Sequence, residues 1–322
     1  MEQVAEAPLR AAAPARTRSE TIAFLIMAAI LIIAPFFTYP LFLMQVMCFA
    51  LFACAFNLLI GYVGLLSFGH ALYFGWASYV CAHAAKVWGL TPELAIIAGT
   101  LTAAGLGLIA GLLAIRRQGI YFAMITLALA QMMYFFALQA KFTGGEDGIQ
   151  GVPRGKLFGV FDLGHTMTMY VVVLVIFLGC FLLIHRIINS PFGEVLKAIR
   201  ENEARAISLG YKTDRYKLMA FVLSATLAGT AGATKAIVLQ IASLTDVNWP
   251  MSGEVVLMTL VGGLGTIFGP VIGAFVILTM QYKLAPVGEW VLVIQGVIFV
   301  ACVLLFRRGI VGELARIFKI KL

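Results

Sequence analysis

The chain has 322 residues, of which 62% are hydrophobic and only 12% are charged, and its mean hydropathy is +0.99. Soluble domains are close to half apolar and about a quarter charged, so this composition excludes an ordinary soluble globule. The apolar runs are continuous rather than alternating, which excludes a membrane β-barrel and predicts an all-α polytopic membrane protein. The net charge of +8 does not indicate nucleic-acid binding, because the cations lie in loops and at span ends, where they meet membrane lipid.

Residues 1–20 are rich in Ala, Pro and Arg and show no apolar periodicity, which predicts a disordered cytoplasmic tail. The apolar run that follows has no A-x-A cleavage pattern and leads directly into a second run, so we interpret it as an uncleaved first helix. Because one span needs about 20 apolar residues, we expect about eight to ten transmembrane helices. The apolar segments are 22–38, 41–60, 64–85, 93–115, 119–139, 167–188, 216–241, 253–281 and 288–306.

Basic residues at the span ends predict the topology, since Lys and Arg are enriched on the cytoplasmic side. Three arginines before residue 20 place the N-terminus in the cytoplasm, and even numbers of crossings return Arg116–Arg117 and the segment 190–217 to that side. The basic segment 309–322 would then lie outside if 253–281 were one span. We therefore expect 253–281 to be re-entrant or doubled, which makes 309–322 a cytoplasmic C-terminal tail and 21–308 the transmembrane domain.

The chain has two glycine-rich interruptions, and the one within 253–281 supports this topology. One is GGLGTIFGP within 253–281, and the other is GYVGLLSFGHALYFG, which begins at Gly61. Similar breaks in the two halves of a membrane chain point to a transport pathway built from repeats, although close helix packing also uses small residues. For His70, a hydrogen-bonded packing role competes with a ligand role. The candidate pathway residues are Gly61, Gly64, Ser67, Gly69, His70, Gly262, Gly263, Gly265, Gly269 and Pro270.

The segment 140–166 is rich in Gly, Asp and Pro, and the topology predicts that it forms an external loop. Its Glu146 and Asp147 could bind a cation or a partner protein, although solvated loop carboxylates are the simpler interpretation.

The segment 190–217 is polar, with six Lys or Arg and four Asp or Glu between apolar spans. Ser190 and Pro191 suit the start of a helix, and Gly210 suits its end. Apolar residues form one stripe, which predicts a two-faced helix with an i,i+4 pair, Glu201–Arg205, on its wet face. The stripe residues are Val195, Ile199, Ala206 and Leu209, flanked by Leu196 and Ile207. The same pattern also fits a helix lying on the membrane surface.

The spans themselves contain few ionisable residues, although such residues usually mark functional sites in membranes. Lys235 lies near a span end, from which its amine can snorkel. The sequence has no catalytic triad, no P-loop and no His or Cys metal motif, so we expect neither enzymatic activity nor a bound cofactor or metal. The five cysteines lie in apolar stretches and fit the role of small hydrophobes. Energy for active transport would have to enter from another subunit.

Four blocks in order resemble the LivM-type permeases of bacterial branched-chain amino-acid ABC importers, over roughly Phe49 to Gly312. They are FNLLIGYVGLLSFGHALYFGWASY, then RRQGIYFAMITLALAQ with TGGEDGIQGVP, then SPFGEVLKAIRENEARAISLGYKTDRYKLMAFVLSATLAGTAGA, and finally LVGGLGTIFGPVIGA.

This resemblance implies that the segment 190–217 is a cytoplasmic coupling helix that docks on an ATPase subunit. ABC permeases show an E-A-A-x-x-x-G pattern there, and this chain has Glu203-Ala204-x-Ala206 with Gly210 one position late. The implied ATPase-coupling residues are Arg200, Glu203, Ala204, Arg205, Ala206 and Gly210.

The resemblance also implies a set of partners in a bacterial inner membrane: a homologous LivH-type permease, two ABC ATPases that use ATP and Mg²⁺, and a periplasmic solute-binding protein. The external loop 140–166 would face the binding protein. Relatives of this family also serve urea, amides and aromatic acids, so these remain alternative solutes. An ion-coupled secondary carrier is the alternative from another class, and a membrane-embedded enzyme is disfavoured by the missing polar cluster.

Overall fold

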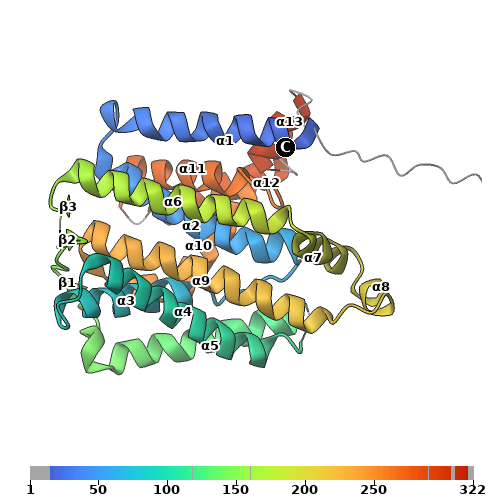
Figure 1. Cartoon of the computed structure of the whole chain (residues 1–322), viewed down its shortest axis with the longest axis horizontal. Coiled ribbons are helices and arrows are strands. Elements are labelled where there is room, and N and C mark those ends of the chain that lie inside the picture. The colour runs from blue at the N-terminus through green and yellow to red at the C-terminus, as the bar shows by residue number, and fades with distance from the viewer. Residues whose placement is uncertain (1–14, 118, 160, 289, 306–308, 318–322) are drawn as a thin grey trace, which may run out of the picture.

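Apolar helices account for most of the chain in this computed structural model, which describes residues 15–117, 119–159, 161–288, 290–305 and 309–317. The helices that lie side by side in the bundle of Figure 1 are α1 (Ala15–Ile33), α2 (Pro40–Tyr62), α3 (His70–Lys86), α4 (Pro92–Ala114), α5 (Ile120–Gln139), α6 (Thr166–Ile188), α9 (Thr213–Leu239), α10 (Trp249–Gly262), α11 (Gly269–Leu284) and α12 (Trp290–Leu305). At one end of this bundle, which we call the α7–α8 end, lie α7 (Pro191–Glu201), α8 (Glu203–Ser208) and α13 (Gly309–Ile317).

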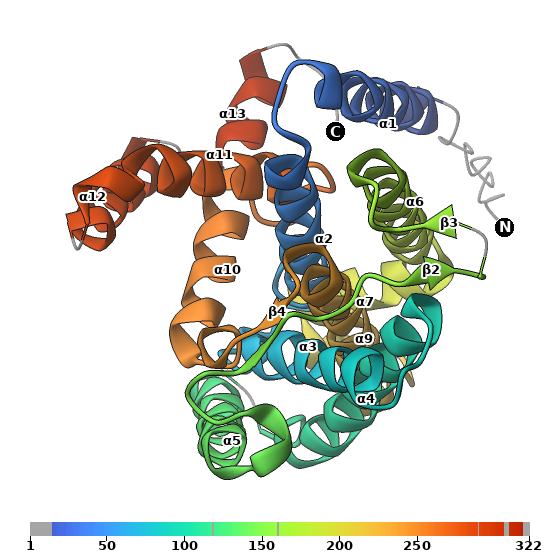
Figure 2. The same cartoon turned by 90° about the vertical axis from the view of Figure 1, so that its left-hand side faces the viewer.

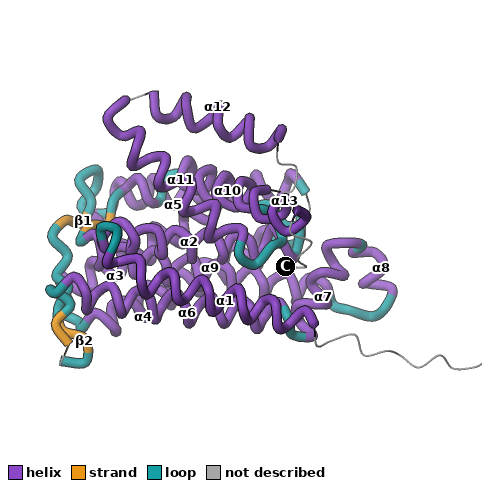
Figure 3. The backbone as a smooth tube through the Cα atoms, turned by 90° about the horizontal axis from the view of Figure 1, so that it is seen from above, coloured by secondary structure: helices purple, strands orange, loops and turns teal. Residues whose placement is uncertain are grey.

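Among the described helices, five are long and apolar enough by themselves to cross a membrane: α2, α4, α5, α6 and α9. The remaining bundle helices run alongside them (Figure 1, Figure 3). The only strands in the described chain are two-residue pieces. The predicted fold class, an all-α polytopic membrane protein, is confirmed.

Helix α2 is the centre of the bundle. The end-on view places it inside a ring of other helices, with α12 at the margin (Figure 2). In its membrane window 89% of the residues are buried, against 28% for α4 and for α5. A helix that is apolar all round fits such a position, because every face meets protein.

Helix α9 packs against α2, α3 and α4 despite its lower hydropathy. Small residues make these contacts possible. A Cβ on Gly232 would collide with the Phe74 carbonyl of α3, and one on Gly229 would collide with Ala103 of α4. Close backbone approach through Gly and Ala is the usual packing mode of membrane helices, where apolar burial alone gives little preference for protein over lipid.

The apolar segment 253–281 is divided, as the charge pattern predicted. Helix α10 ends at Gly262, the backbone turns through 263–268, and α11 returns from Gly269. Gly263 and Gly265 have positive φ angles of 125° and 74°, which disfavour residues with a Cβ. The two helices pack tightly as a hairpin, since a Cβ on Gly273 would overlap the Met258 carbonyl.

The opposite end of the bundle, which we call the loop end, carries the segment 140–166. It contains η2 (Lys141–Thr143), β1 (Ile149–Gln150), β2 (Lys156–Leu157) and β3 (Phe161–Asp162). Strand β1 pairs with β4 (Ile241–Ala242), which follows α9, and β2 pairs with β3. The other connections include η1 (Ala34–Phe36), η3 (Leu244–Asp246) and η4 (Ala285–Val287). The loop is therefore fastened to the α9–α10 connection.

Two expectations about the termini are wrong in part. Residues 15–20, expected in a disordered tail, form the first turns of α1. Residues 309–317, expected in a basic tail, form α13, which packs against α10 and α11. Residues 1–14 and 318–322, which make up the rest of both expected tails, lie outside the described residues. Helix α13 is short and amphipathic and buries Val311, whereas residues 15–20 extend the first apolar helix by about one and a half turns.

Candidate functional site

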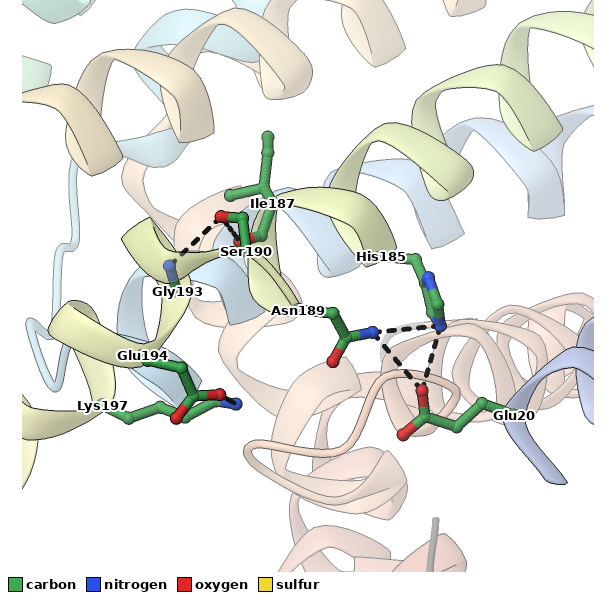
Figure 4. Close-up of polar contacts among 8 residues, drawn as sticks. All are labelled: Glu20, His185, Ile187, Asn189, Ser190, Gly193, Glu194 and Lys197. Atoms are coloured by element: carbon green, nitrogen blue, oxygen red, sulfur yellow. Dashed lines mark hydrogen bonds and ion pairs between the residues drawn. The ribbon is translucent and has the colours of Figure 1, made fainter. Parts of the chain in front are cut away.

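Helix α7 begins as the sequence predicted. The Ser190 hydroxyl accepts a hydrogen bond from the Gly193 amide at 3.4 Å and donates one to the Ile187 carbonyl at 2.6 Å (Figure 4). Pro191 occupies the first helical position, where no amide hydrogen is needed. The cap fixes the direction in which α7 leaves α6.

The expected single helix over 190–210 is wrong, because it is broken at Asn202. This residue is extended (φ −157°, ψ 97°), and its side chain accepts a hydrogen bond from the Arg205 amide at 3.0 Å. Asn competes for backbone groups in this way and therefore starts helices better than it continues them. Glu201 and Arg205 consequently do not share one continuous helix, which removes the expected i,i+4 pair.

The apolar stripe expected along this segment is only partly buried. Leu196, Ile199 and Ala206 face the bundle, whereas Ile207 is 55% exposed and Leu209 is 68% exposed. Gly210 ends the segment in the left-handed conformation, as predicted, with φ +89°. Its amide donates to the Ile207 carbonyl at 2.9 Å.

Glu203 and Lys217 form an ion pair between α8 and the first turns of α9. The side chain of Lys217 is only 3% exposed, so the pair holds α8 against the bundle. Of the remaining implied coupling residues in α8, Ala204 and Arg205 are exposed and Ala206 is buried.

The two glycine-rich breaks meet at the α7–α8 end of α2. Asn57 donates from Nδ2 to the Thr266 carbonyl at 2.9 Å and accepts at Oδ1 from the Gly265 amide at 3.0 Å. A Cβ on Gly61, one turn further along α2, would lie 2.9 Å from the Gly265 nitrogen and would touch Asn57. Gly61 therefore leaves the space into which the tip of the α10–α11 hairpin fits.

Arg200 of α7 reaches the same place. Its guanidinium donates a hydrogen bond to the Gly61 carbonyl. A Cβ on Gly265 would lie 3.2 Å from Arg200 Nη1, and one on Gly64 would lie 3.2 Å from Arg200 Cγ. Three predicted pathway residues and one predicted coupling residue are thus neighbours: Gly61, Gly64, Gly265 and Arg200. We call them, with Asn57 and Thr266, the α2 junction.

An open cleft lies beside the α2 junction, with a volume of about 540 Å³. Its wall is mostly polar and comes from the ends of α2 and α6, from α7 and from the hairpin tip. The lining residues are Tyr62, Ile188, Asn189, Glu194, Lys197, Arg200, Glu201, Gly265 and Ile267. Glu194 and Lys197 form an ion pair at 2.8 Å along this wall (Figure 4).

The other predicted pathway residues lie elsewhere. His70 is completely buried, with Nε2 2.8 Å from the Ser224 hydroxyl and its ring edge-on to Phe56. These contacts fit the first of its two interpretations, a hydrogen-bonded packing histidine. Ser67 accepts from the Gly69 amide at 3.2 Å, and Gly69 abuts α5.

The remaining glycines of the second break shape the hairpin itself. A Cβ on Gly262 would collide with the Gly269 carbonyl, and Gly263 contacts Gly309 of α13. Pro270 is buried in the first turn of α11. These positions fit the close-packing interpretation.

Asn57 and Thr266 were missed from the sequence. One signal existed, because Asn57 is a polar residue in an apolar span and lies four positions before Gly61. Its partner loop is more than 200 residues away in the chain, so no local pattern could identify it.

Two further polar contacts stabilise the bundle. Glu20 of α1 accepts from His185 and Asn189 at the end of α6, at 3.1 and 3.4 Å (Figure 4). Lys235, expected to snorkel, instead forms an ion pair with Asp246. Among the described residues, no three His, Cys, Asp or Glu side chains are placed to hold a metal ion.

Comparison with known families decides the assignment. The model of the family described as "Branched-chain amino acid transport system / permease component" matches residues 39–303. The chain belongs to this family. The match runs from the start of α2 into α12, so it includes both glycine-rich breaks and the α7–α8 segment, and the predicted resemblance is confirmed.

Curated relatives of this permease family agree. The high-affinity branched-chain amino acid transport system permease protein LivM of Escherichia coli is 26% identical over 277 residues, which cover 79% of this chain and 65% of LivM. The chain thus spans slightly less than two thirds of that relative. The ribose import permease protein RbsC of Bacillus subtilis is 31% identical, over 69% of this chain and 70% of RbsC. The probable permease LivH of Methanocaldococcus jannaschii is 26% identical, over 73% and 79%.

No solved structure matches the chain. All the relatives above are named as transport permeases rather than as enzymes. The family and the apolar helices together make this chain a multi-pass membrane protein of the permease class.

Proposed function

We propose that this chain is a permease subunit of an ATP-driven ABC importer for branched-chain amino acids. It forms half of the translocation pathway, and a homologous LivH-type permease forms the other half. Two ATPase subunits supply the energy from ATP and Mg²⁺, and a periplasmic solute-binding protein delivers the solute. The chain resides in a bacterial inner membrane with both termini in the cytoplasm. Family membership and the names of the LivM and LivH relatives support this proposal.

The exposed apolar surface of α8 is the observation that carries the proposal. Ile207 and Leu209 are 55% and 68% exposed, and α8 projects beyond the ends of the membrane-spanning helices (Figure 1). Because α8 lies past the ends of those helices, we take a protein partner rather than lipid as the cover for these side chains. Arg205 is exposed on the same short helix and adds a charge at the rim. This surface is the docking site of the ATPase.

The α2 junction supports the coupling part of the proposal. The segment that carries the docking surface also contacts both glycine-rich breaks. Arg200 donates a hydrogen bond to the Gly61 carbonyl of the first break, and its guanidinium lies beside Gly265 of the second. A movement imposed on α7 and α8 therefore has a short physical route to the centre of the bundle. The breaks are the parts of the path that change between its two openings.

The test is uptake of labelled leucine by proteoliposomes that contain this chain with its ATPases, its partner permease and its binding protein. We expect ATP-dependent uptake with the unchanged chain. In the double variant I207S/L209S, we expect both the amount of ATPase that co-purifies with the chain and the rate of leucine uptake to fall at least tenfold. The control is V87S, because Val87 is 63% exposed on the connection after α3, away from α8. Full uptake by the double variant would contradict the docking site.

Two further arms of this experiment test the remaining alternatives. Uptake driven by an ion gradient without any ATPase would support a secondary carrier. Competition by urea, amides, aromatic acids or ribose instead of by leucine would retain the importer and change its solute.

A further inference from the structure

Arg200 is the only described residue of α7 or α8 whose side chain hydrogen-bonds to α2 among the contacts that the structure records. It does so at the end of the helix, where the last carbonyls have no intrahelical partner and carry partial negative charge. A guanidinium is well suited to this position, because it supplies several donors in a fixed plane and stays charged. Arg200 therefore acts as a cap on α2 provided by another helix.

The hairpin tip is attached to the same face of α2, one turn earlier. Asn57 lies four residues before Gly61, so the two residues share a face. Both amide atoms of Asn57 hold the backbone of 265–266. The hairpin tip and α7 thus contact one short stretch of α2, and each is held there by side-chain to backbone hydrogen bonds.

The cleft of about 540 Å³ separates the rest of this face of α7 from the hairpin tip. Helix α7 is also packed through the buried side chains of Leu196, one turn before Arg200, and Ile199, and this packing does not involve the guanidinium. Removal of the guanidinium should therefore leave α7 in place, while it removes the polar connection across the cleft edge.

We propose that Arg200 is the positioning residue that transmits movement of α7 to both glycine-rich breaks. It does this through its hydrogen bond to Gly61 and its contact beside Gly265, and not through contact with the ATPase. This inference rests on the proposed function. It changes the role of Arg200 from a docking residue, as the resemblance implied, to a link inside the permease.

The test compares R200A, R200Q and R200K in the complete reconstituted importer, with leucine as the probe. The measured quantity is the number of leucine molecules taken up per ATP hydrolysed. We expect R200A and R200Q to keep the ATPase bound and active but to lower this ratio at least tenfold. We expect R200K to restore part of it, because Lys retains the charge and a donor. The matched control is R215A, since Arg215 is an exposed arginine in the first turn of α9 at the same end of the bundle.

Each outcome decides the proposal. A ratio within twofold of the unchanged chain in R200A or R200Q would overturn it, as would loss of ATPase binding, which would make Arg200 a docking residue. Failure of all three variants to reach the membrane would show that Arg200 is needed for folding and would also overturn it. If the unchanged importer shows no ATP-driven uptake, the proposed function fails, and this inference fails with it.

Discussion

Lys235 and Asp246 form an ion pair in which both side chains are almost completely buried, with 6% and 3% of their surfaces exposed. The amine lies 2.5 Å from the carboxylate, and the same carboxylate oxygen accepts from the Ser243 amide at 3.3 Å. The pair joins α9 to the connection that leads into α10. Because both charges are buried away from water, each depends on the opposite charge of its partner.

Breaking this pair from one side should be costly. K235M or D246N leaves one buried charge uncompensated, which is expected to destabilise the protein by about 3–5 kcal/mol. The double variant K235M/D246L removes both charges and should recover much of that loss. The thermal stability of each variant in detergent, monitored by size-exclusion chromatography after heating, tests this prediction. The control is K283M, because Lys283 is exposed. A double variant that is no more stable than either single variant would contradict the pairing.

Two helical glycines are expected to respond differently to alanine, because Gly232 of α9 packs against α3 whereas Gly105 of α4 has open space around it. G232A places a methyl group against the Phe74 carbonyl and should destabilise the protein by about 1–3 kcal/mol through overpacking. G105A in α4 meets no atom within 4 Å, so it should be neutral or stabilising by up to about 1 kcal/mol. Melting temperatures of the two variants, measured in the same detergent, test this difference. Equal destabilisation would contradict the close approach.

The cap at Ser190 predicts a local effect. S190A removes the acceptor for the Gly193 amide and should lower the stability of α7 by about 1 kcal/mol. S190D keeps an acceptor and should retain most of the stability. Hydrogen exchange of the α7 amides reports on this helix alone. Unchanged exchange in S190A would show that the cap contributes nothing measurable.

The two hydrogen bonds of the Asn57 side chain predict that the hairpin tip becomes more mobile when this side chain is removed. N57A leaves the Gly265 amide and the Thr266 carbonyl without their partner, at a cost of about 1–3 kcal/mol. Exchange of the Gly265 amide should therefore accelerate about tenfold or more. The control is Q45A on the same helix, because Gln45 makes no side-chain hydrogen bond among the contacts recorded for the described residues. Equal exchange rates in both variants would contradict the role of these hydrogen bonds.

Much of the fold follows from local patterns. Runs of about 20 apolar residues identify the spans, and the Gly and Pro residues between Gly262 and Pro270 identify the hairpin turn. The basic residues at the span ends also predict this division, because a single span over 253–281 would place the basic segment 309–322 outside. The caps at Ser190 and Gly210 are also local, because each depends on residues within one turn.

The α2 junction could not be predicted in the same way. Asn57 and Gly265 are 208 residues apart, and their contact depends on how two helices pack. The break at Asn202 depends on one side chain choosing a cap over helix continuation, which helical periodicity does not reveal. Lys235 likewise looks like a snorkelling residue in the sequence. Its true partner, Asp246, lies in the connection after α9, where helical periodicity gives no indication of which residues meet.

The α10–α11 hairpin has a consequence for how the chain is made. The two helices have 14 and 16 residues and are about 21 and 24 Å long, shorter than the hydrocarbon core of about 30 Å. Neither helix alone offers the apolar length of an independent span. Gly262 and Gly273 lie where the two helices meet and let their backbones approach closely. We therefore expect the two helices to enter the bilayer together as one unit, with the end of α2 as the surface on which their connecting turn rests.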